Sequence, residues 1–236
     1  MEWRDYQAAL FDLDGVLTPT ADVHMHAWRD MFNEFLAQVP DQGPYTDDDY
    51  FIHVDGKPRF DGVRDFLASR GIHLPEGDPL DPGGAATVCG LGNRKNEMFN
   101  AIIASEGVAP YPGSVACLDT VAALGLKLAV VSSSQNAEAV LAAAGLADRF
   151  TVVVDGRVAR TEGLPGKPAP NTFLRAAELV GVPAERCVVI EDAVSGVQAG
   201  AAGGFGCVLG VDRGVGADEL LSHGADVVVA DLAEVA

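Results

Sequence analysis

The chain has 236 residues, of which 48% are hydrophobic and 21% are charged, and its formal net charge at pH 7 is −18. This length and composition predict a folded protein, with either one full core or a core and an inserted domain, and exclude a disordered chain. The negative charge argues against nucleic acid and anionic membranes as partners, because the field of the protein would repel both.

The first predicted element is a buried strand that ends in two carboxylates. Residues 8–11 form an apolar run, which is typical of a buried strand. Asp12 and Asp14 follow it, and Gly15 allows a sharp turn. Like charges two positions apart point the same way and repel each other. They need a cation such as Mg²⁺, a shared proton or full solvation, although these residues alone are also compatible with an acidic surface loop.

From about residue 21 to residue 106 the signals are those of helices and loops. Apolar residues at helical spacing predict a helix from Val23 to Val39. We expect Gly71 to end a second helix. Residues 74–90 are rich in Pro, Gly and Asp and predict a loop, whereas residues 93–105 predict another helix.

After Pro112 the pattern changes to alternating strands and helices. Strand-like runs occur at 127–131, 150–154, 187–190, 206–209 and 226–229, and helical patterns occur at 115–124, 137–144, 171–180 and 194–201. This alternation predicts a mostly parallel sheet with right-handed crossovers. We therefore predict an α/β core made of residues 1–20 and 108–236, with residues 21–107 inserted as a helical domain.

The cysteines and the N-terminus favour a cytoplasmic protein. Cys89, Cys117, Cys187 and Cys207 lie far apart and show neither metal-ligand spacing nor the density of a disulfide scaffold. The first residues lack the basic start and apolar core of a signal peptide. No apolar run is long enough to span a bilayer.

A cluster of hydroxyl groups follows the predicted strand at 127–131. Its members are Ser132, Ser133 and Ser134, with Asn136 two positions further on. Hydroxyls and unbonded backbone N–H groups at a strand end suit an anionic oxygen. The same residue types also cap helices, so capping alone would explain them.

A lysine and a second acidic pair complete the pattern. Lys167 lies between Gly166 and Pro168 just before a predicted helix. It is either a local cation that binds an anionic substrate or an ordinary solvated side chain. Glu191 and Asp192 follow the strand at 187–190. They are either a second pair of functional carboxylates or, through Asp192, a helix cap. Carboxylates after two strands of one sheet meet at the same edge, which capping does not explain. The ordered combination therefore predicts one shared site.

These motifs resemble those of the haloacid dehalogenase superfamily of phosphotransferases, and within it the β-phosphoglucomutase-like branch. Further similarities are Ala27-Trp28, Arg94-Lys95-Asn96, Tyr111-Pro112-Gly113 and Lys167-Pro168-Ala169-Pro170. The resemblance implies a Rossmann-like α/β fold, with helices on both faces of a mostly parallel sheet and an inserted helical cap. It implies Mg²⁺-dependent phosphoryl transfer on a small sugar phosphate through an aspartyl-phosphate. We expect a monomer.

The resemblance also assigns roles to the residues of the core. Asp12 would be the nucleophile and Asp14 the general acid/base. Ser132 and Lys167 would bind the transferring phosphoryl group. The Mg²⁺ ligands would be Asp12, the backbone carbonyl of Asp14, Glu191 and Asp192.

Substrate contacts implied by the resemblance come from both domains. They are Thr20, His24, Trp28, Gly56, Arg59, Lys95, Ser133, Ser134 and Asn136. His24 would couple closure of the cap to positioning of the acid/base, although a structural histidine beside Trp28 is the alternative, and Trp28 is itself expected in the core. The chain departs from the pattern of the mutases at Pro19, Asp55, Ser133 and Gln135. These departures bear on sugar specificity and not on the chemistry.

Several functions remain open at this point. A phosphatase would pass the phosphoryl group to water, and a mutase would pass it to a second sugar hydroxyl. A carbon–halogen hydrolase needs no Mg²⁺ and has little use for an acid at Asp14. A phosphonate-cleaving enzyme needs a Schiff-base lysine, for which Lys57 and Lys95 are poor candidates. A non-catalytic binding domain is disfavoured because every catalytic residue type is present.

Overall fold

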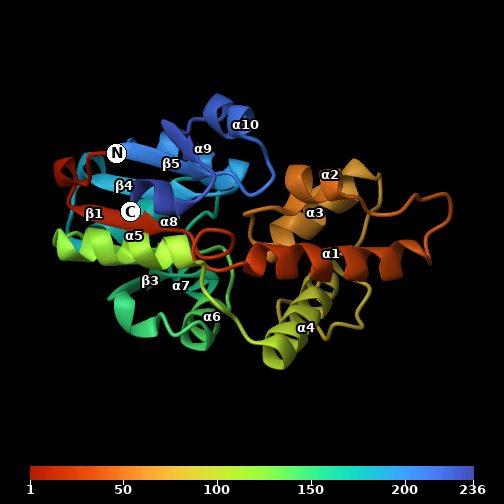
Figure 1. Ribbon diagram of the computed structural model, residues 1–236. Coiled ribbons are helices and arrows are strands. Elements are labelled where there is room, and N and C mark those ends of the chain that lie inside the picture. Colours follow the sequence, from red (N-terminus) through yellow and green to blue (C-terminus); the bar gives the residue numbers. More distant parts are fainter. The chain divides into compact units, whose positions relative to one another are not determined.

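The computed structural model describes residues 1–236 and divides the chain into two compact units (Figure 1). The first unit, which we call the core unit, consists of Met1–Thr20 and Val108–Ala236. The second, the helical unit, consists of Ala21–Gly107. No helix in either unit combines the length and the apolar character needed to cross a membrane.

The core unit is built on one parallel sheet of six strands in the order β3-β2-β1-β4-β5-β6. The strands are β1 (Ala8–Phe11), β2 (Lys127–Val131), β3 (Val152–Val154), β4 (Cys187–Glu191), β5 (Cys207–Val211) and β6 (Val227–Val229). The order reverses at the central strand β1, which pairs with β2 on one side and β4 on the other. Open α/β sheets bind ligands beyond the carboxyl ends of the strands at such a reversal.

Helices cover both faces of this sheet, as its apolar strands require. Ala8 and Leu10 of β1 pack into a cluster with Phe173 of helix α8, while the alternate residues Ala9 and Phe11 are equally buried on the other face. The predicted fold class is therefore confirmed. The helices of the core unit are α5 (Pro112–Ala123), α6 (Ala137–Ala143), α7 (Gly156–Glu162), α8 (Asn171–Val180), α9 (Val194–Ala202) and α10 (Ala217–Ser222).

Single turns of 3₁₀ helix complete the core unit. They are η1 (Trp3–Asp5), η3 (Ala147–Arg149), η4 (Ala184–Arg186) and η5 (Leu232–Val235). The chain ends meet here, because the Trp3 indole Nε1 donates to the carbonyl of Val235 at 2.6 Å. Neither α7 nor α10 was expected from the sequence. The start of α7 depends on the side chain of Asp155, which accepts hydrogen bonds from the amides of Arg157 and Val158, both at 2.9 Å.

The helical unit has its own aromatic core. Its elements are α1 (Thr20–Leu36, which starts in the last residue of the core unit), α2 (Asp47–Asp49), the π-helical turn η2 (Tyr50–Val54), α3 (Arg59–Ser69) and α4 (Val88–Glu106). Phe32 lies against Phe66 with ring centroids 4.1 Å apart, and Tyr45 stacks on Phe32 at 5.0 Å. These rings belong to a buried cluster that also holds Met31 and Leu91.

Two predicted boundaries in this unit were wrong by a few residues. The first helix ends at Leu36 and not at Val39. The last begins at Val88, inside the predicted loop, because the Thr87 hydroxyl accepts a hydrogen bond from the Gly90 amide at 2.9 Å and caps it. Gly71 follows α3 with a φ of +66°, as expected of a residue that ends a helix.

Candidate active site

The register of the sheet places the carboxyl ends of β1, β2 and β4, and the polar residues that follow them, beside one another. Phe11, the last residue of β1, pairs with Val130 of β2 and Ile190 of β4. The Asp12 amide still donates to the carbonyl of Ile190 at 2.9 Å, and the Ser132 amide donates to that of Val154 at 3.1 Å. Asp12 and Ser132 therefore leave the sheet as direct continuations of its central strands.

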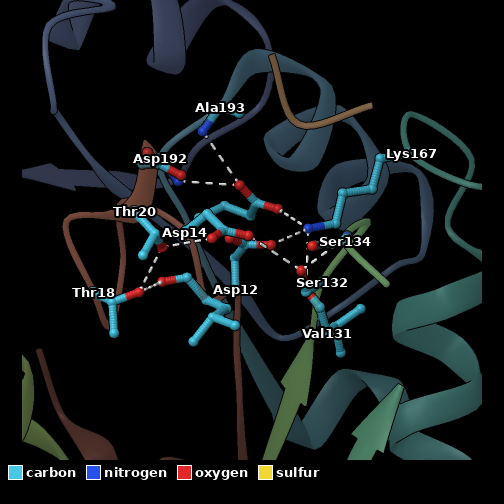
Figure 2. Close-up of polar contacts among 12 residues, drawn as sticks. Asp12, Asp14, Thr18, Thr20, Val131, Ser132, Ser134, Lys167, Asp192 and Ala193 are labelled. Atoms are coloured by element: carbon cyan, nitrogen blue, oxygen red, sulfur yellow. Dashed lines mark hydrogen bonds and ion pairs between the residues drawn. The ribbon is translucent and has the colours of Figure 1, made fainter. Parts of the chain in front are cut away.

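Lys167 is the buried cation of this site, and its side chain points toward the end of β1 (Figure 2). Its Nζ donates to Oδ1 of Asp12, to Oε1 of Glu191 and, at 3.1 Å, to the carbonyl of Val131. Burial alone would lower the pKa of Lys167, but the two carboxylates raise it above its ordinary value. The lysine therefore stays protonated and neutralises part of the acidic cluster.

Asp12 lies in the opposite electrostatic situation. Burial raises the pKa of Asp12 well above its ordinary value, and Lys167 only partly opposes this, since Glu191 and Asp14 raise the pKa further. In its ionised form, the buried carboxylate is thus short of positive charge. An additional cation beside Asp12 would favour its charged form.

Asp14 has surroundings of a different kind, because hydroxyl groups hold its carboxylate. Oδ1 accepts a hydrogen bond from the Thr20 hydroxyl at 2.5 Å, and Oδ2 accepts one from the Ser132 hydroxyl at 3.3 Å. The Thr20 hydroxyl also lies 2.7 Å from that of Thr18 (Figure 2). In these contacts the ammonium of Lys167 holds Asp12, whereas hydroxyl groups hold Asp14.

Glycines make room for the second acidic pair. Glu191 Oε2 accepts hydrogen bonds from the amides of Asp192 at 3.1 Å and Ala193 at 3.2 Å. A Cβ on Gly196 would lie 1.9 Å from Glu191 Oε1, and one on Gly15 would lie 1.8 Å from Asp192 Oδ2. Each carboxylate thus occupies space that any other residue at these glycines would fill.

Three of these carboxylates are close enough to share a cation. Asp12, Glu191 and Asp192 each offer one oxygen, and the three oxygens lie within 4.8 Å of one another. Mg²⁺ takes oxygen ligands at about 2.0–2.1 Å, so ligands on opposite sides of the ion are roughly 4 Å apart. The donor set and its spacing fit Mg²⁺. The Asp14 side chain is outside this set, which leaves its backbone carbonyl as the contribution predicted from the sequence.

The serine loop after β2 folds on itself. The Ser134 amide donates to the Ser132 hydroxyl at 3.0 Å, and the Asn136 amide donates to the Ser134 hydroxyl at 3.1 Å. Asn136 takes the N-cap position of α6, but its side chain makes no capping hydrogen bond. The loop places Ser132 beside Asp14. Ser133 approaches the neighbouring α7 start, since a Cβ on Gly156 would lie 2.7 Å from the carbonyl oxygen of Ser133.

In the helical unit, His24, Trp28 and Lys95 form one cluster. Lys95 is buried on α4, and its Nζ contacts Nδ1 of His24. The same Nζ lies 4.9 Å from the centroid of the Trp28 ring, and His24 stacks on Phe99 at 4.0 Å. Trp28 is buried, as expected of a core residue.

Gly56 and Arg59 lie before and at the start of α3. Gly56 has a φ of +68°, which favours glycine. The Arg59 guanidinium lies over the ring of Phe60 at 5.0 Å, and its Cγ would be 3.6 Å from a Cβ on Gly92 of α4. Lys57 is held by Asp65 at 2.7 Å. Arg59 thus lies against the helix that carries Lys95.

One residue that contacts this region was missed in the sequence. Arg213 follows β5, and its Nε donates to the carbonyl of Gly15 at 2.8 Å. Its position after a strand was a usable signal, because the carboxyl ends of parallel strands share one edge of the sheet.

Comparisons with known proteins agree with this geometry. A family model described as haloacid dehalogenase-like hydrolase matches residues 6–204. The chain is 52% identical over 238 residues to a β-phosphoglucomutase of Mycobacterium bovis, covering 97% of this chain and 90% of that protein. It is 39% identical to an uncharacterized glycosyl hydrolase of Mycobacterium tuberculosis, covering 98% of this chain but 18% of that protein. The crystal structure of β-phosphoglucomutase from Clostridium difficile matches with a TM-score of 0.78 and 25% identity, covering 98% of this chain and 93% of that one.

Proposed function

Because the chain belongs to the haloacid dehalogenase-like hydrolase family and is an enzyme of its phosphatase and phosphomutase class, we propose that it isomerises a small sugar phosphate through an aspartyl-phosphate on Asp12. The observation that carries the proposal is the setting of Asp12, a buried carboxylate bound by Lys167 and grouped with Glu191 and Asp192. The similarity to β-phosphoglucomutases over nearly the whole chain supports a sugar hydroxyl as the acceptor.

Mg²⁺ is the cofactor in this proposal. Asp12, Glu191 and Asp192, together with the backbone carbonyl of Asp14, would hold it. When bound, it supplies positive charge that stabilises both the ionised nucleophile and the phosphoryl oxygens.

The nucleophile and the groups around it then divide the work. Lys167 binds Oδ1 of Asp12, so we assign the attack on phosphorus to Oδ2. The bond from phosphorus to the sugar oxygen breaks as the new bond to Asp12 forms. Lys167 and Ser132 would stabilise the charge that spreads over the oxygens of the transferring group.

Asp14 handles the proton in both half-reactions. It gives a proton to the leaving sugar oxygen in the first step and takes one from the acceptor hydroxyl in the second. The Thr20 hydroxyl holds one oxygen of its carboxylate, and the Ser132 hydroxyl holds the other until it turns to the phosphoryl group. These hydrogen bonds restrict the Asp14 carboxylate to one orientation, which we assign to proton transfer.

We assign the helical unit, residues 21–107, to substrate recognition and the exclusion of water, as a cap. His24, Arg59 and Lys95 would contact the sugar phosphate, together with Gly56 and Trp28 of the same unit and Thr20, Ser133, Ser134 and Asn136 of the core unit. A related domain within a longer protein named as a glycosyl hydrolase supports a sugar-derived substrate. The four buried free cysteines support a cytoplasmic location.

The proposal is tested by product analysis. The enzyme is incubated with β-glucose 1-phosphate, Mg²⁺ and a glucose bisphosphate primer, and phosphorus NMR follows the products. We expect glucose 6-phosphate to form much faster than inorganic phosphate. Release of inorganic phosphate at the turnover rate, with no glucose 6-phosphate, would show a phosphatase instead.

A further inference from the structure

The loop that follows the acid pair is held from outside by three residues of two distant segments, the loop after β5 and the start of α5. Its carbonyls accept hydrogen bonds in succession: Gly15 from Arg213 Nε at 2.8 Å, Val16 from the Ser114 hydroxyl at 2.6 Å, and Leu17 from the Tyr111 amide at 3.0 Å. Ser114 and Tyr111 belong to or precede α5. Arg213 alone among the three reaches the loop with a long charged side chain.

The guanidinium of Arg213 is held on several sides. Its centre lies 3.9 Å from the centroid of the Tyr111 ring. Nη1 donates to the carbonyl of Ala230 at 3.2 Å and lies 3.6 Å from Asp231 Oδ2. Asp212 folds the loop that carries Arg213, because its Oδ1 accepts from the amides of residues 214 and 216 at 2.9 and 3.0 Å. The planar fork of arginine matches this arrangement, which a lysine could satisfy only in part.

The conformation of Gly15 is the feature that Arg213 controls. Gly15 has a φ of +85°, and its N–H donates to the carbonyl of Thr18 at 2.8 Å. Its carbonyl is the one bound by Arg213. The peptide groups on both sides of Gly15 are thus fixed, and glycine would otherwise rotate freely. The peptide on the N-terminal side carries the carbonyl of Asp14.

The backbone conformation of Gly15 is important because this residue lies very close to Asp192 of the second acidic pair. A Cβ on Gly15 would lie 1.8 Å from Asp192 Oδ2, so the loop and Asp192 are packed as closely as glycine permits. Rotation about Gly15 would change the separation of the Asp14 carbonyl from Asp192. Arg213 also keeps its Nη2 buried without a hydrogen-bond partner, an arrangement that costs stability and is unexpected of a residue kept for stability alone.

We propose that Arg213 is a positioning residue for the divalent-cation site: by binding the Gly15 carbonyl, it holds the Asp14 carbonyl at the distance from Asp192 that the ion requires. This inference rests on the proposed function only in placing a cation among Asp12, Asp14, Glu191 and Asp192. It assigns a role to a residue outside the four sequence motifs.

Electrostatics and positioning predict opposite effects when Arg213 is replaced. Loss of a positive charge near a cation site strengthens cation binding by Coulomb's law. Loss of the Gly15 contact makes the loop mobile. Cation binding must then order the loop, and the entropy lost in doing so weakens binding. The sign of the change in affinity therefore separates the two.

The experiment is a titration of the purified full chain with Mn²⁺, with free ion followed by electron paramagnetic resonance at fixed ionic strength. The variants are Arg213→Met and Arg213→Lys. The matched control is Arg175→Met, which removes the same charge from a side chain paired only with Glu162 and Glu178 on the surface. Thermal melts establish that each variant is folded at the assay temperature. They also separate the two roles, since a purely structural role would lower the melting temperature without changing the Kd for Mn²⁺.

We expect Arg213→Met to raise the Kd for Mn²⁺ about tenfold, which corresponds to about 1.4 kcal/mol. Arg213→Lys should raise it by a smaller factor, and Arg175→Met should leave it within twofold. An unchanged or lower Kd in Arg213→Met overturns the inference while leaving the proposed function intact. If that variant does not fold, an unchanged Kd in Arg213→Lys overturns it. Failure of the unaltered chain to bind Mn²⁺ would instead contradict the proposed metal site itself.

Discussion

Replacement of Asp12 by Asn should make the metal-free protein more stable while abolishing turnover. Burial raises the pKa of Asp12 well above its ordinary value, and the opposing effect of Lys167 does not compensate. At neutral pH without a divalent cation, Asp12 and Glu191 share one buried cation, Lys167. Asparagine removes one of the two negative charges and keeps nearly the same volume.

The size of the effect follows from the cost of the excess charge. A buried polar group that lacks its compensating partner costs about 1–3 kcal/mol, and a charged one costs more. For a chain of this length, about 1 kcal/mol shifts the melting temperature by about 2–4 °C. We therefore expect Asp12→Asn to melt several degrees above the unaltered chain in EDTA at pH 7.

The pH dependence has a defined sign. Between the ordinary pKa of an aspartate and the raised pKa of Asp12, the folded protein holds a proton that the unfolded chain has lost. The stability contributed by Asp12 is therefore present at low pH and is lost as the pH rises through the raised pKa. The advantage of Asp12→Asn should shrink at low pH, and Mg²⁺ should also reduce it by stabilising the unaltered chain more than the variant, which lacks one carboxylate ligand.

The assay is a series of thermal melts in EDTA from pH 4 to pH 8. Asp30→Asn is the matched control, because Asp30 is exposed and its replacement removes the same charge. If Asp12→Asn melts at or below the temperature of the unaltered chain in EDTA at pH 7, the account of a charge-strained nucleophile is refuted.

Three further substitutions test other parts of the site. Lys167→Met should destabilise the protein by about 3–5 kcal/mol, because it leaves buried carboxylates without their cation, and thermal melts together with steady-state rates would check this. Gly15→Ala should abolish tight Mn²⁺ binding, since its Cβ would meet Asp192 and its φ is +85°; an unchanged Kd would show that the loop adapts. Thr20→Val should lower kcat about tenfold through loss of its hydrogen bond to Asp14, whereas Thr20→Ser should retain most of the rate, and equal rates in both variants would remove Thr20 from the mechanism.

Much of the core unit could be predicted because its signals are local. The apolar run at 127–131 and the helical pattern at 171–180 coincide with β2 and α8, since burial on the sheet imposes their periodicity. The grouping of Asp12 with Glu191 follows from strand ends that share one edge of a parallel sheet. Lys167 reaches them from the turn before α8.

Features that depend on single side chains could not be predicted in the same way. The short helix α7 starts where Asp155 caps it, and α4 starts where Thr87 caps it, so hydrogen bonds and not apolar periodicity decide both. The contact of Arg213 with Gly15 joins residues 198 positions apart. Such long-range contacts become visible only when the strands are placed.

The most direct test of the proposed mechanism is to find where the phosphoryl group resides during turnover. The enzyme is mixed with the sugar phosphate and Mg²⁺, quenched in acid within milliseconds, digested and analysed by mass spectrometry. We predict a phosphoryl group on Asp12 of the unaltered chain and none in Asp12→Asn. Turnover with the phosphoryl group on another residue, or with no phosphorylated enzyme at any quench time, would contradict the assignment of Asp12 as the nucleophile.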